Sequence, residues 1–115
     1  MNSLFQGCDQ FNQPIGGWDT SSVTNMSYMF RFANVFDQDL SSWNVANVTS
    51  MQDFMNGVTL STTNYDSTLG GWSPQSVQNG VNVHFGSSKY STATGAAYRA
   101  TLVSKGWTIT DGGAV

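Results

Sequence analysis

The sequence is poor in charge. It contains no glutamate, seven aspartates and only four lysines or arginines, so charged residues make up 10% of 115 residues, against ~25% in an average domain. The basic residues are dispersed along the chain, and the net charge is −3. A nucleic-acid-binding protein needs clustered basic side chains to neutralise phosphates. We therefore expect no nucleic-acid partner.

Cysteine and long apolar runs are also scarce. The single Cys8 can form neither an internal disulfide nor a cysteine-based zinc site. No apolar run approaches the ~20 residues that span a bilayer. The start of the chain lacks the basic-then-apolar pattern of a signal peptide. We expect no membrane span, no signal peptide in this chain, no metal and no cofactor.

Neutral polar residues take the place of charged ones. Serine, threonine, asparagine and glutamine together number 44, and aromatic residues account for 13% of the chain. A chain of 115 residues can bury roughly 65% of its unfolded surface, which suffices for one core in one domain. A neutral polar surface over such a core favours a secreted or cell-surface protein.

An internal repeat runs through the first two thirds of the chain. Seven apolar positions recur at a step of 25 residues: Phe5, Phe11, Ile15, Trp18, Val23, Met26 and Met29 are followed by Phe30, Phe36, Leu40, Trp43, Val48, Met51 and Phe54. A third copy follows at a step of 29 residues, with Tyr65, Leu69, Trp72 and Val77 in register. A repeat of this length predicts stacked units that bury their apolar faces against one another.

Each repeat unit is predicted to be a short strand followed by a helix. The residues after the repeat tryptophans are typical helix N-caps: Asp19, Asn44 and Ser73. The tryptophan and the valine five residues later then fit a hydrophobic staple, which gives three structural pairs: Trp18 with Val23, Trp43 with Val48, and Trp72 with Val77. Apolar residues at three- and four-residue spacing predict helices over 23–33 and 48–55.

The last third has a different pattern. It predicts a short helix over 74–79, a strand over 81–85, a helix from Thr94 to Gly106 and a final strand over 107–110. An array of repeats needs an atypical terminal unit to close its core. We therefore divide the single domain into repeat units (1–72), a C-terminal capping unit (73–111) and a tail (112–115).

The repeats resemble a known family. Residues 36–51, with the run Phe-Asp-Gln-Asp-Leu-Ser-Ser-Trp-Asn-Val, resemble the BspA-like bacterial surface-protein repeat, a relative of the leucine-rich repeat. Residues 11–30 and the segments 71–73, 88–91 and 106–113 extend the resemblance. It implies a cell-surface or secreted location, in some members adhesion, and no catalytic residues. The expected fold class is α/β, a short leucine-rich-repeat-like solenoid of strand–helix units with an α+β C-terminal cap.

The chain begins inside a repeat. Residues 2–8 match the end of the next copy, so they are predicted to form the tail of a helix with no preceding unit. This leaves Leu4, Phe5 and Phe11 exposed at an open end. We expect that the chain is a fragment of a longer array, and that it forms a homodimer through these N-terminal ends.

Four residues are candidates for ligand binding. Tyr28 and Phe32 lie outside the repeat pattern and form an aromatic pair one predicted helical turn apart, while Asp37 and Asp39 form the densest acidic cluster. The predicted function is non-enzymatic contact with a protein or a glycan. Packing against the neighbouring unit explains the aromatic pair equally well, and a solvated turn explains the two aspartates.

An enzyme is the alternative. A small hydrolase could use two carboxylates among Asp37, Asp39 and Asp53, together with His84. No spacing singles out a pair of these carboxylates. Cys8 and His84 could form a nucleophile and base, but Cys8 aligns with Ala33 and is expected to be a small core residue, while alternation places His84 on the outer face of a strand.

Overall fold

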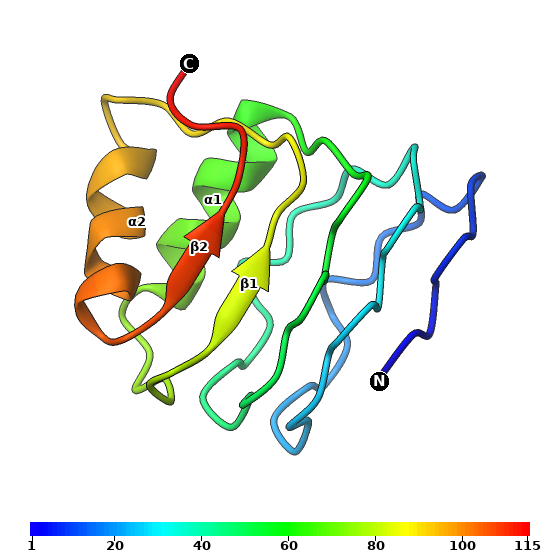
Figure 1. Cartoon of the computed structure of the whole chain (residues 1–115), viewed down its shortest axis with the longest axis horizontal. Helices are drawn as coiled ribbons and strands as arrows, with labels where there is room; N and C mark the ends of the chain where they lie inside the picture. Colours follow the sequence, from blue (N-terminus) through cyan, green and yellow to red (C-terminus); the bar gives the residue numbers. More distant parts are fainter.

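Four regular elements lie in the second half of the chain, and the computed structural model describes all residues, 1–115. Helix α1 spans Thr62–Trp72, strand β1 Asn82–His84, helix α2 Gly95–Ser104 and strand β2 Thr108–Thr110. The two strands pair in parallel, with Val83 opposite Ile109. Figure 1 shows α2 beside β2 at one end of the molecule, α1 behind the strands, and the N-terminal segment at the opposite end.

Three irregular segments continue the layer of β1 and β2. We call residues 3–7, 26–32 and 50–56 the first, second and third segments. Backbone amides of the first segment donate to carbonyls of the second, namely Ser3 to Ser27, Phe5 to Met29 and Gly7 to Arg31. The second segment donates to the third in the same way, with Met26, Tyr28, Phe30 and Phe32 bonding to Ser50, Gln52, Phe54 and Asn56. A bridge between Met51 and Val83 joins the third segment to β1.

The predicted solenoid of strand–helix units is wrong. Residues 23–33 and 48–55 contain no helix, and the molecule is a compact globule of 32 × 31 × 22 Å with two helices and a two-stranded parallel sheet. The second segment is a chain of tight turns, in which the amide of Met29 bonds to Met26 and that of Arg31 to Tyr28. Such turns return every third or fourth side chain to the interior. Their apolar spacing therefore imitates the spacing of a helix.

Left-handed residues prevent these turns from becoming helices. Positive φ angles recur at equivalent repeat positions, at Ser3 (59°), Tyr28 (60°) and Asp53 (50°), and again at Gly7 (71°), Phe32 (63°) and Gly57 (87°). Glycine adopts this conformation without steric cost, whereas other residues pay roughly 1–2 kcal/mol. Tyr28 and Phe32 thus carry large aromatic side chains on a strained backbone.

The predicted helix caps and staples are wrong for the same reason. Asp19 and Asn44 each accept a hydrogen bond from the backbone amide two residues ahead, Ser21 and Ala46, at 3.0 Å. Short polar side chains commonly close a turn in this way, so their cap-like position does not distinguish a turn from a helix start. Ser73 lies at the C-cap of α1 rather than at the start of a helix over 74–79, where no helix forms.

Helix α1 was not predicted. Its threonines and its glycines Gly70 and Gly71 disfavour a helix. The structure explains both glycines by close packing, because a Cβ on Gly71 would lie 2.1 Å from the carbonyl oxygen of Ser41, and one on Gly70 would lie 3.0 Å from the ring of Tyr98. Burial of the apolar side of α1, including Tyr65 and Trp72, stabilises the helix despite its weak intrinsic propensity.

The elements predicted after residue 80 form as expected. Strand β1 lies within 81–85, β2 lies within 107–110, and α2 begins after its N-cap Thr94. The chain leaves α2 through Gly106 at a φ of 99°. In this region the pattern matches the structure because real strands and a real helix generate it.

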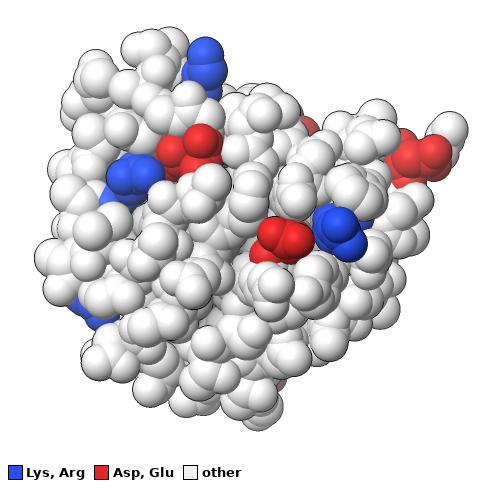
Figure 2. All heavy atoms as spheres, viewed as in Figure 1, with Lys and Arg blue, Asp and Glu red and all other residues white.

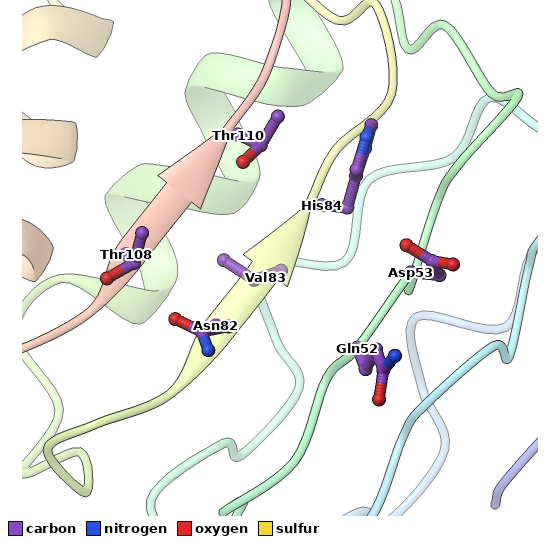
Figure 3. A pocket seen from close by; sticks show the side chains of 7 residues that line it. All are labelled: Gln52, Asp53, Asn82, Val83, His84, Thr108 and Thr110. Carbon is purple, nitrogen blue, oxygen red and sulfur yellow. The ribbon is translucent and has the colours of Figure 1, made fainter.

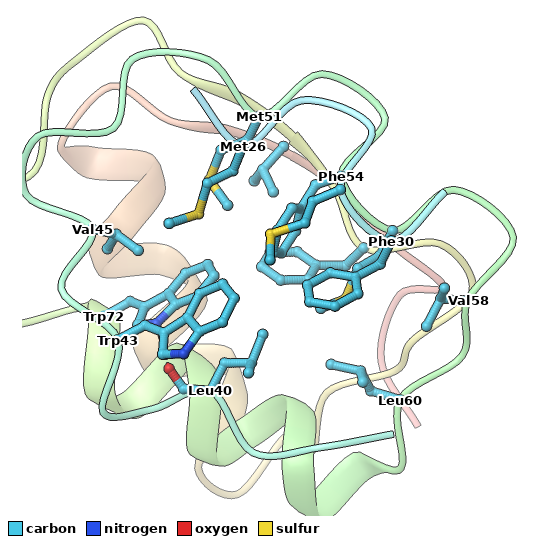
Figure 4. Close-up of a cluster of buried hydrophobic side chains, with 14 of the residues drawn as sticks. Met26, Phe30, Leu40, Trp43, Val45, Met51, Phe54, Val58, Leu60 and Trp72 are labelled. Carbon is cyan, nitrogen blue, oxygen red and sulfur yellow. Dashed lines mark hydrogen bonds between the residues drawn. The ribbon is translucent and has the colours of Figure 1, made fainter. Parts of the chain in front are cut away.

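The core follows the repeat tryptophans. Trp43 and Trp72 are fully buried with Val48, whereas Trp18 is 41% exposed and Val23 and Val77 are half-buried. Each buried indole N–H donates to a backbone carbonyl about one repeat earlier, from Trp43 to Ile15, Trp72 to Leu40 and Trp107 to Gln78. Figure 4 shows Trp43 and Trp72 in the same part of the core, with Leu40 below them. These bonds tie successive segments together through the interior.

Candidate functional site

A shallow polar hollow lies on the outer face of the strands. It has a volume of about 180 Å³ and is lined by Gln52, Asp53, Asn82, Val83, His84, Thr108 and Thr110. The third segment supplies the first two residues, β1 the next three and β2 the two threonines (Figure 3). Alternation along β1 and β2 explains this lining, because Val83 and Ile109 point into the core and their neighbours point outward.

Most polar side chains of the hollow have no partner within the protein. Gln52, Asn82, Thr108 and Thr110 make no side-chain hydrogen bond to another residue, and all four are exposed. His84 accepts a hydrogen bond from the backbone amide of Gly86 at Nδ1, at 2.9 Å. Its Nε2 therefore carries the proton and is free to donate. The hollow offers amide, hydroxyl and imidazole groups to an external molecule.

Several amide side chains elsewhere in the fold do have partners within the protein. There they link the chain to itself across one repeat: Asn12 accepts from Asp37 and Gln38, Gln75 donates to Trp43, Gln78 donates to Ala46, and Asn64 donates to Asp37. Asn12, Gln75 and Gln78 thereby satisfy backbone groups that irregular structure leaves unpaired. Other amides, those of Gln6, Gln10, Gln13, Asn34, Asn56 and Asn79, also make no side-chain hydrogen bond, so the hollow is distinguished by the gathering of such groups at one concave site.

An aromatic and cationic cluster adjoins the hollow. The guanidinium of Arg31 lies 4.5 Å from the ring centre of Phe32 and 5.7 Å from that of Tyr28, within the range of cation–π attraction. Arg31 also approaches the carboxylate of Asp53, at 3.8 Å from its Nε, and this buried Nε has no hydrogen-bond partner. Because Asp53 lines the hollow as well, it joins the two sites into one surface.

Of the four predicted ligand-binding residues, the structure places two, Tyr28 and Phe32, together beside Arg31. Tyr28 and Phe32 flank Arg31, with Phe32 47% exposed, in left-handed turns rather than on a helix. Asp37 and Asp39 instead bond to α1 and the segment before it. Asp37 accepts from Ser61 and Asn64, and Asp39 accepts from Ser41 and Ser67.

The electrostatics of Asp39 reflect these structural bonds. Burial acts to raise the pKa of its carboxyl, but the hydrogen bonds from Ser41 and Ser67 outweigh burial and hold that pKa below its ordinary value. A carboxylate kept ionised by two structural donors is suited to anchoring α1. It is not presented to the hollow, which Asp53 alone among the aspartates lines.

Several residues of the hollow and the adjoining cluster were not predicted from the sequence, and the location of one cysteine was predicted wrongly. Arg31, Gln52 and Asn82 carried no signal beyond polarity, although the alternation of β1 did place Asn82 and His84 on the outer face. The expectation that Cys8 is a small core residue is wrong, because its thiol is exposed. The equivalent Ala33 of the next copy is fully buried.

A second polar network lies between α1, α2 and the end of β2. The hydroxyl of Tyr65 donates to Asp111 at 2.5 Å, and Arg99 donates to the same carboxylate oxygen at 2.8 Å and to the carbonyl of Ile109 at 3.1 Å. Burial, followed by the adjacent carboxylate of Asp111, raises the pKa of Tyr65 above its usual range. This network holds the C-terminal end of the fold closed.

Charge is sparse over the face that carries the hollow. Figure 2 shows the acidic and basic groups of this face as isolated spots on a neutral surface. No group of three histidine, cysteine or acidic side chains is arranged to hold a metal ion. Neither helix has the length and apolar character that a bilayer-spanning segment requires.

The comparisons with known proteins identify a family. The family described as "Mycoplasma protein of unknown function, DUF285" matches residues 1–96. The chain belongs to the DUF285 family. No curated protein and no solved structure shows significant similarity to the chain. Since the DUF285 description assigns no activity, residue roles in this family member rest on the geometry described above.

Proposed function

We propose that this DUF285 chain is a non-enzymatic binding module of a bacterial surface or secreted protein, and that it contacts a glycan or a protein through the hollow and the adjoining aromatic cluster. The observation that carries the proposal is the set of unpartnered polar side chains on one face, Gln52, Asn82, Thr108 and Thr110, beside Phe32. The surface location is proposed from the resemblance to BspA-like repeats and from the neutral polar composition.

The chemistry of the hollow favours hydroxyl-rich ligands. Amides both donate and accept hydrogen bonds, as threonine hydroxyls do, and they match sugar hydroxyls and peptide groups without using net charge. An exposed aromatic ring such as Phe32 adds an apolar contact area. The open hollow of about 180 Å³ is smaller than the ~300–1,000 Å³ of enclosed ligand pockets. This size favours a ligand that contacts the protein surface over one that is enclosed in a pocket.

A non-enzymatic role is favoured over the Asp-dependent hydrolase by the placement of the carboxylates. A hydrolase of that kind needs two carboxyl groups facing one site. Asp37 and Asp39 bond to the region of α1, and Asp53 faces the hollow paired with Arg31. His84 has Nδ1 occupied by the amide of Gly86, so no carboxylate orients it as a general base.

A binding screen with matched variants tests this proposal. Glycan and protein arrays should give a hit that persists in 1 M salt at about its low-salt strength, because neutral hydrogen bonds are not screened. The double variant Gln52→Ala and Asn82→Ala should weaken that hit by about tenfold or more. Since neither side chain bonds within the protein, its stability should stay unchanged.

The control is a double variant on exposed residues outside the hollow, Gln10→Ala and Thr92→Ala, which should bind like the parent protein. A hit that disappears at moderate salt would contradict a neutral contact. Equal affinity of the hollow and control variants would show that binding occurs elsewhere on the surface.

A further inference from the structure

The chain contains two asparagine–glycine pairs whose folded surroundings differ. They are Asn56-Gly57 and Asn79-Gly80, and a valine follows each of them. An asparagine in this position can react with its own backbone, because the nitrogen of the next residue attacks the side-chain amide carbon and glycine has no Cβ to shield that nitrogen. Since the residues that follow the two asparagines are the same, the fold decides which of the two pairs reacts.

The peptide group between Asn56 and Gly57 has a free amide. The two residues are the centre of a turn that the amide of Val58 closes onto Met55 at 2.9 Å. The carbonyl of Asn56 accepts the amide of Phe32 at 2.8 Å, whereas the amide of Gly57 donates to no group in the protein. A hydrogen bond to a carbonyl polarises its peptide group and makes the N–H of that group more acidic. This acidity favours the reaction, because the deprotonated nitrogen is the nucleophile.

The peptide group between Asn79 and Gly80 has the reverse arrangement. The amide of Gly80 donates to the carbonyl of Gly106 at 3.0 Å, and the carbonyl of Asn79 accepts no hydrogen bond. Gly106 also lies close to the Asn79 side chain, because a Cβ built on Gly106 would lie 2.7 Å from the Cβ of Asn79. The nitrogen of Gly80 must lose a hydrogen bond before it attacks, which should slow the reaction about three- to tenfold.

We propose that Asn56 is a site of spontaneous covalent modification in the folded protein, and that Asn79 is protected from the same reaction. The nitrogen of Gly57 forms a bond to Cγ of Asn56 and the Cγ–Nδ2 bond breaks. The side-chain nitrogen takes up the proton that Gly57 loses and leaves as ammonia, so that a succinimide ring remains. Water then opens this ring. Opening at Cγ gives aspartate, and opening at the former backbone carbonyl gives isoaspartate.

Isoaspartate at position 56 would change the surroundings of Phe32. The main chain would then run through Cβ and Cγ, one carbon longer than before, and the carbonyl that accepts the amide of Phe32 would become part of a free carboxylate. Gly57 packs against the Phe32 ring, since a Cβ built on it would lie 2.9 Å from that ring, and the longer turn would displace it. This inference concerns a reaction of the chain itself and does not depend on the function proposed for the hollow.

Ageing of the native protein in mildly alkaline buffer tests the proposal. Peptide mapping by mass spectrometry follows the loss of each asparagine separately, and an isoaspartate-specific methyltransferase with labelled S-adenosylmethionine measures the isoaspartate formed. Asn56 is expected to react at least about threefold faster than Asn79. Exposure alone predicts the opposite order, because Asn79 is exposed and Asn56 is half-buried. The measurement therefore separates hydrogen bonding from exposure as the cause.

The protein unfolded in guanidinium is the matched control. Without the fold, the two asparagines should react at similar rates, because glycine and valine follow both. Two variants assign the isoaspartate to its source: Asn56→Ser should remove most of the isoaspartate that the native protein forms, and Asn79→Ser should remove little. Both substitutions delete side chains without hydrogen bonds, so both variants should fold.

Three results would overturn the proposal. The first is equal rates for the two asparagines in the native protein. The second is a faster reaction at Asn79, which would show that exposure controls the rate. The third is intact Asn56 in the native protein after the unfolded protein has been fully converted, because it would show that the turn protects this residue.

Discussion

Replacing Trp43 tests whether the repeat tryptophans hold successive segments together. The side chain is fully buried, and its indole N–H donates to the carbonyl of Ile15 at 3.0 Å. Truncation to alanine empties a large aromatic site, which costs ~3–5 kcal/mol, and removes a hydrogen bond worth about 1 kcal/mol. The Ile15 carbonyl keeps a partner, the amide of Trp18, so no buried acceptor is left bare. We expect a total loss of about 4 kcal/mol for Trp43→Ala.

Two further variants sharpen this measurement. Trp43→Phe keeps a buried ring but loses the indole donor and some volume, so a loss of about 1–2 kcal/mol is expected. Trp18→Ala is the matched control: the side chain is 41% exposed, water can fill the space, and a loss below about 2 kcal/mol is expected. Urea unfolding followed by far-ultraviolet circular dichroism gives the three free energies. A difference below about 1 kcal/mol between Trp43→Ala and Trp18→Ala would refute the reasoning.

The remaining predictions concern backbone strain, pH and thiol exposure. Gly57→Ala should cost at least ~1–2 kcal/mol, because φ is 87° and the new Cβ would lie 2.9 Å from the ring of Phe32. Part of this cost should vanish in a Phe32→Ala background, and strict additivity in the double-mutant cycle would contradict the contact. The raised pKa of Tyr65 means that the unfolded chain ionises this phenol first, so parent stability should fall above about pH 10 by up to ~1.4 kcal/mol per pH unit. Tyr65→Phe should lack this alkaline loss, and parallel curves for the two proteins in urea titrations at pH 8 to 11 would speak against it. Cys8 should react with a thiol reagent at the same rate in the native and the urea-unfolded protein, whereas a slow native reaction would place the thiol in the core.

The secondary structure of the C-terminal third could be predicted because each apolar pattern in its sequence arises from one kind of regular element. Alternation around Val83 and around Ile109 arises from two strands, and the apolar spacing before Gly106 arises from a real helix. The second copy of the repeat also placed its large apolar residues in the core, where Phe36, Leu40 and Trp43 are buried, whereas Trp18 of the first copy is 41% exposed.

The first half was not predictable by the same rules. Spacing of three and four residues identifies a helix only if the intervening residues are right-handed, and Tyr28 and Phe32 give no sign in the sequence that they are left-handed. Glycine stands at the equivalent of Phe32 in both neighbouring copies, at positions 7 and 57. A glycine repeated in register was therefore the one available signal that these segments turn instead of winding into helices.

The candidate site was only half visible in the sequence. Tyr28 and Phe32 stood out because they break the repeat, but the residues of the hollow meet only through pairing of β1, β2 and the third segment. Gln52 and Asn82 are separated by the whole of α1 along the chain. No local pattern encodes the proximity of such residues, because proximity depends on which segments stack.

The backbone hydrogen bonds between the three segments all have the same orientation. Amides of the first segment donate to carbonyls of the second, and amides of the second donate to carbonyls of the third. In an ordinary parallel ladder, each strand sends amides to both of its neighbours, and the peptide dipoles across the strands largely cancel. Here the amides from Ser3 to Gly7 and from Met26 to Phe32 that leave their segment all point toward the C-terminal end. Their dipoles of ~3.5 D each add along the stacking axis, much as they do in a helix. The carbonyl ends of these dipoles lie toward the first segment, and their amide ends lie toward β1. The field around the protein therefore reflects the orientation of its backbone as well as its net charge of −3.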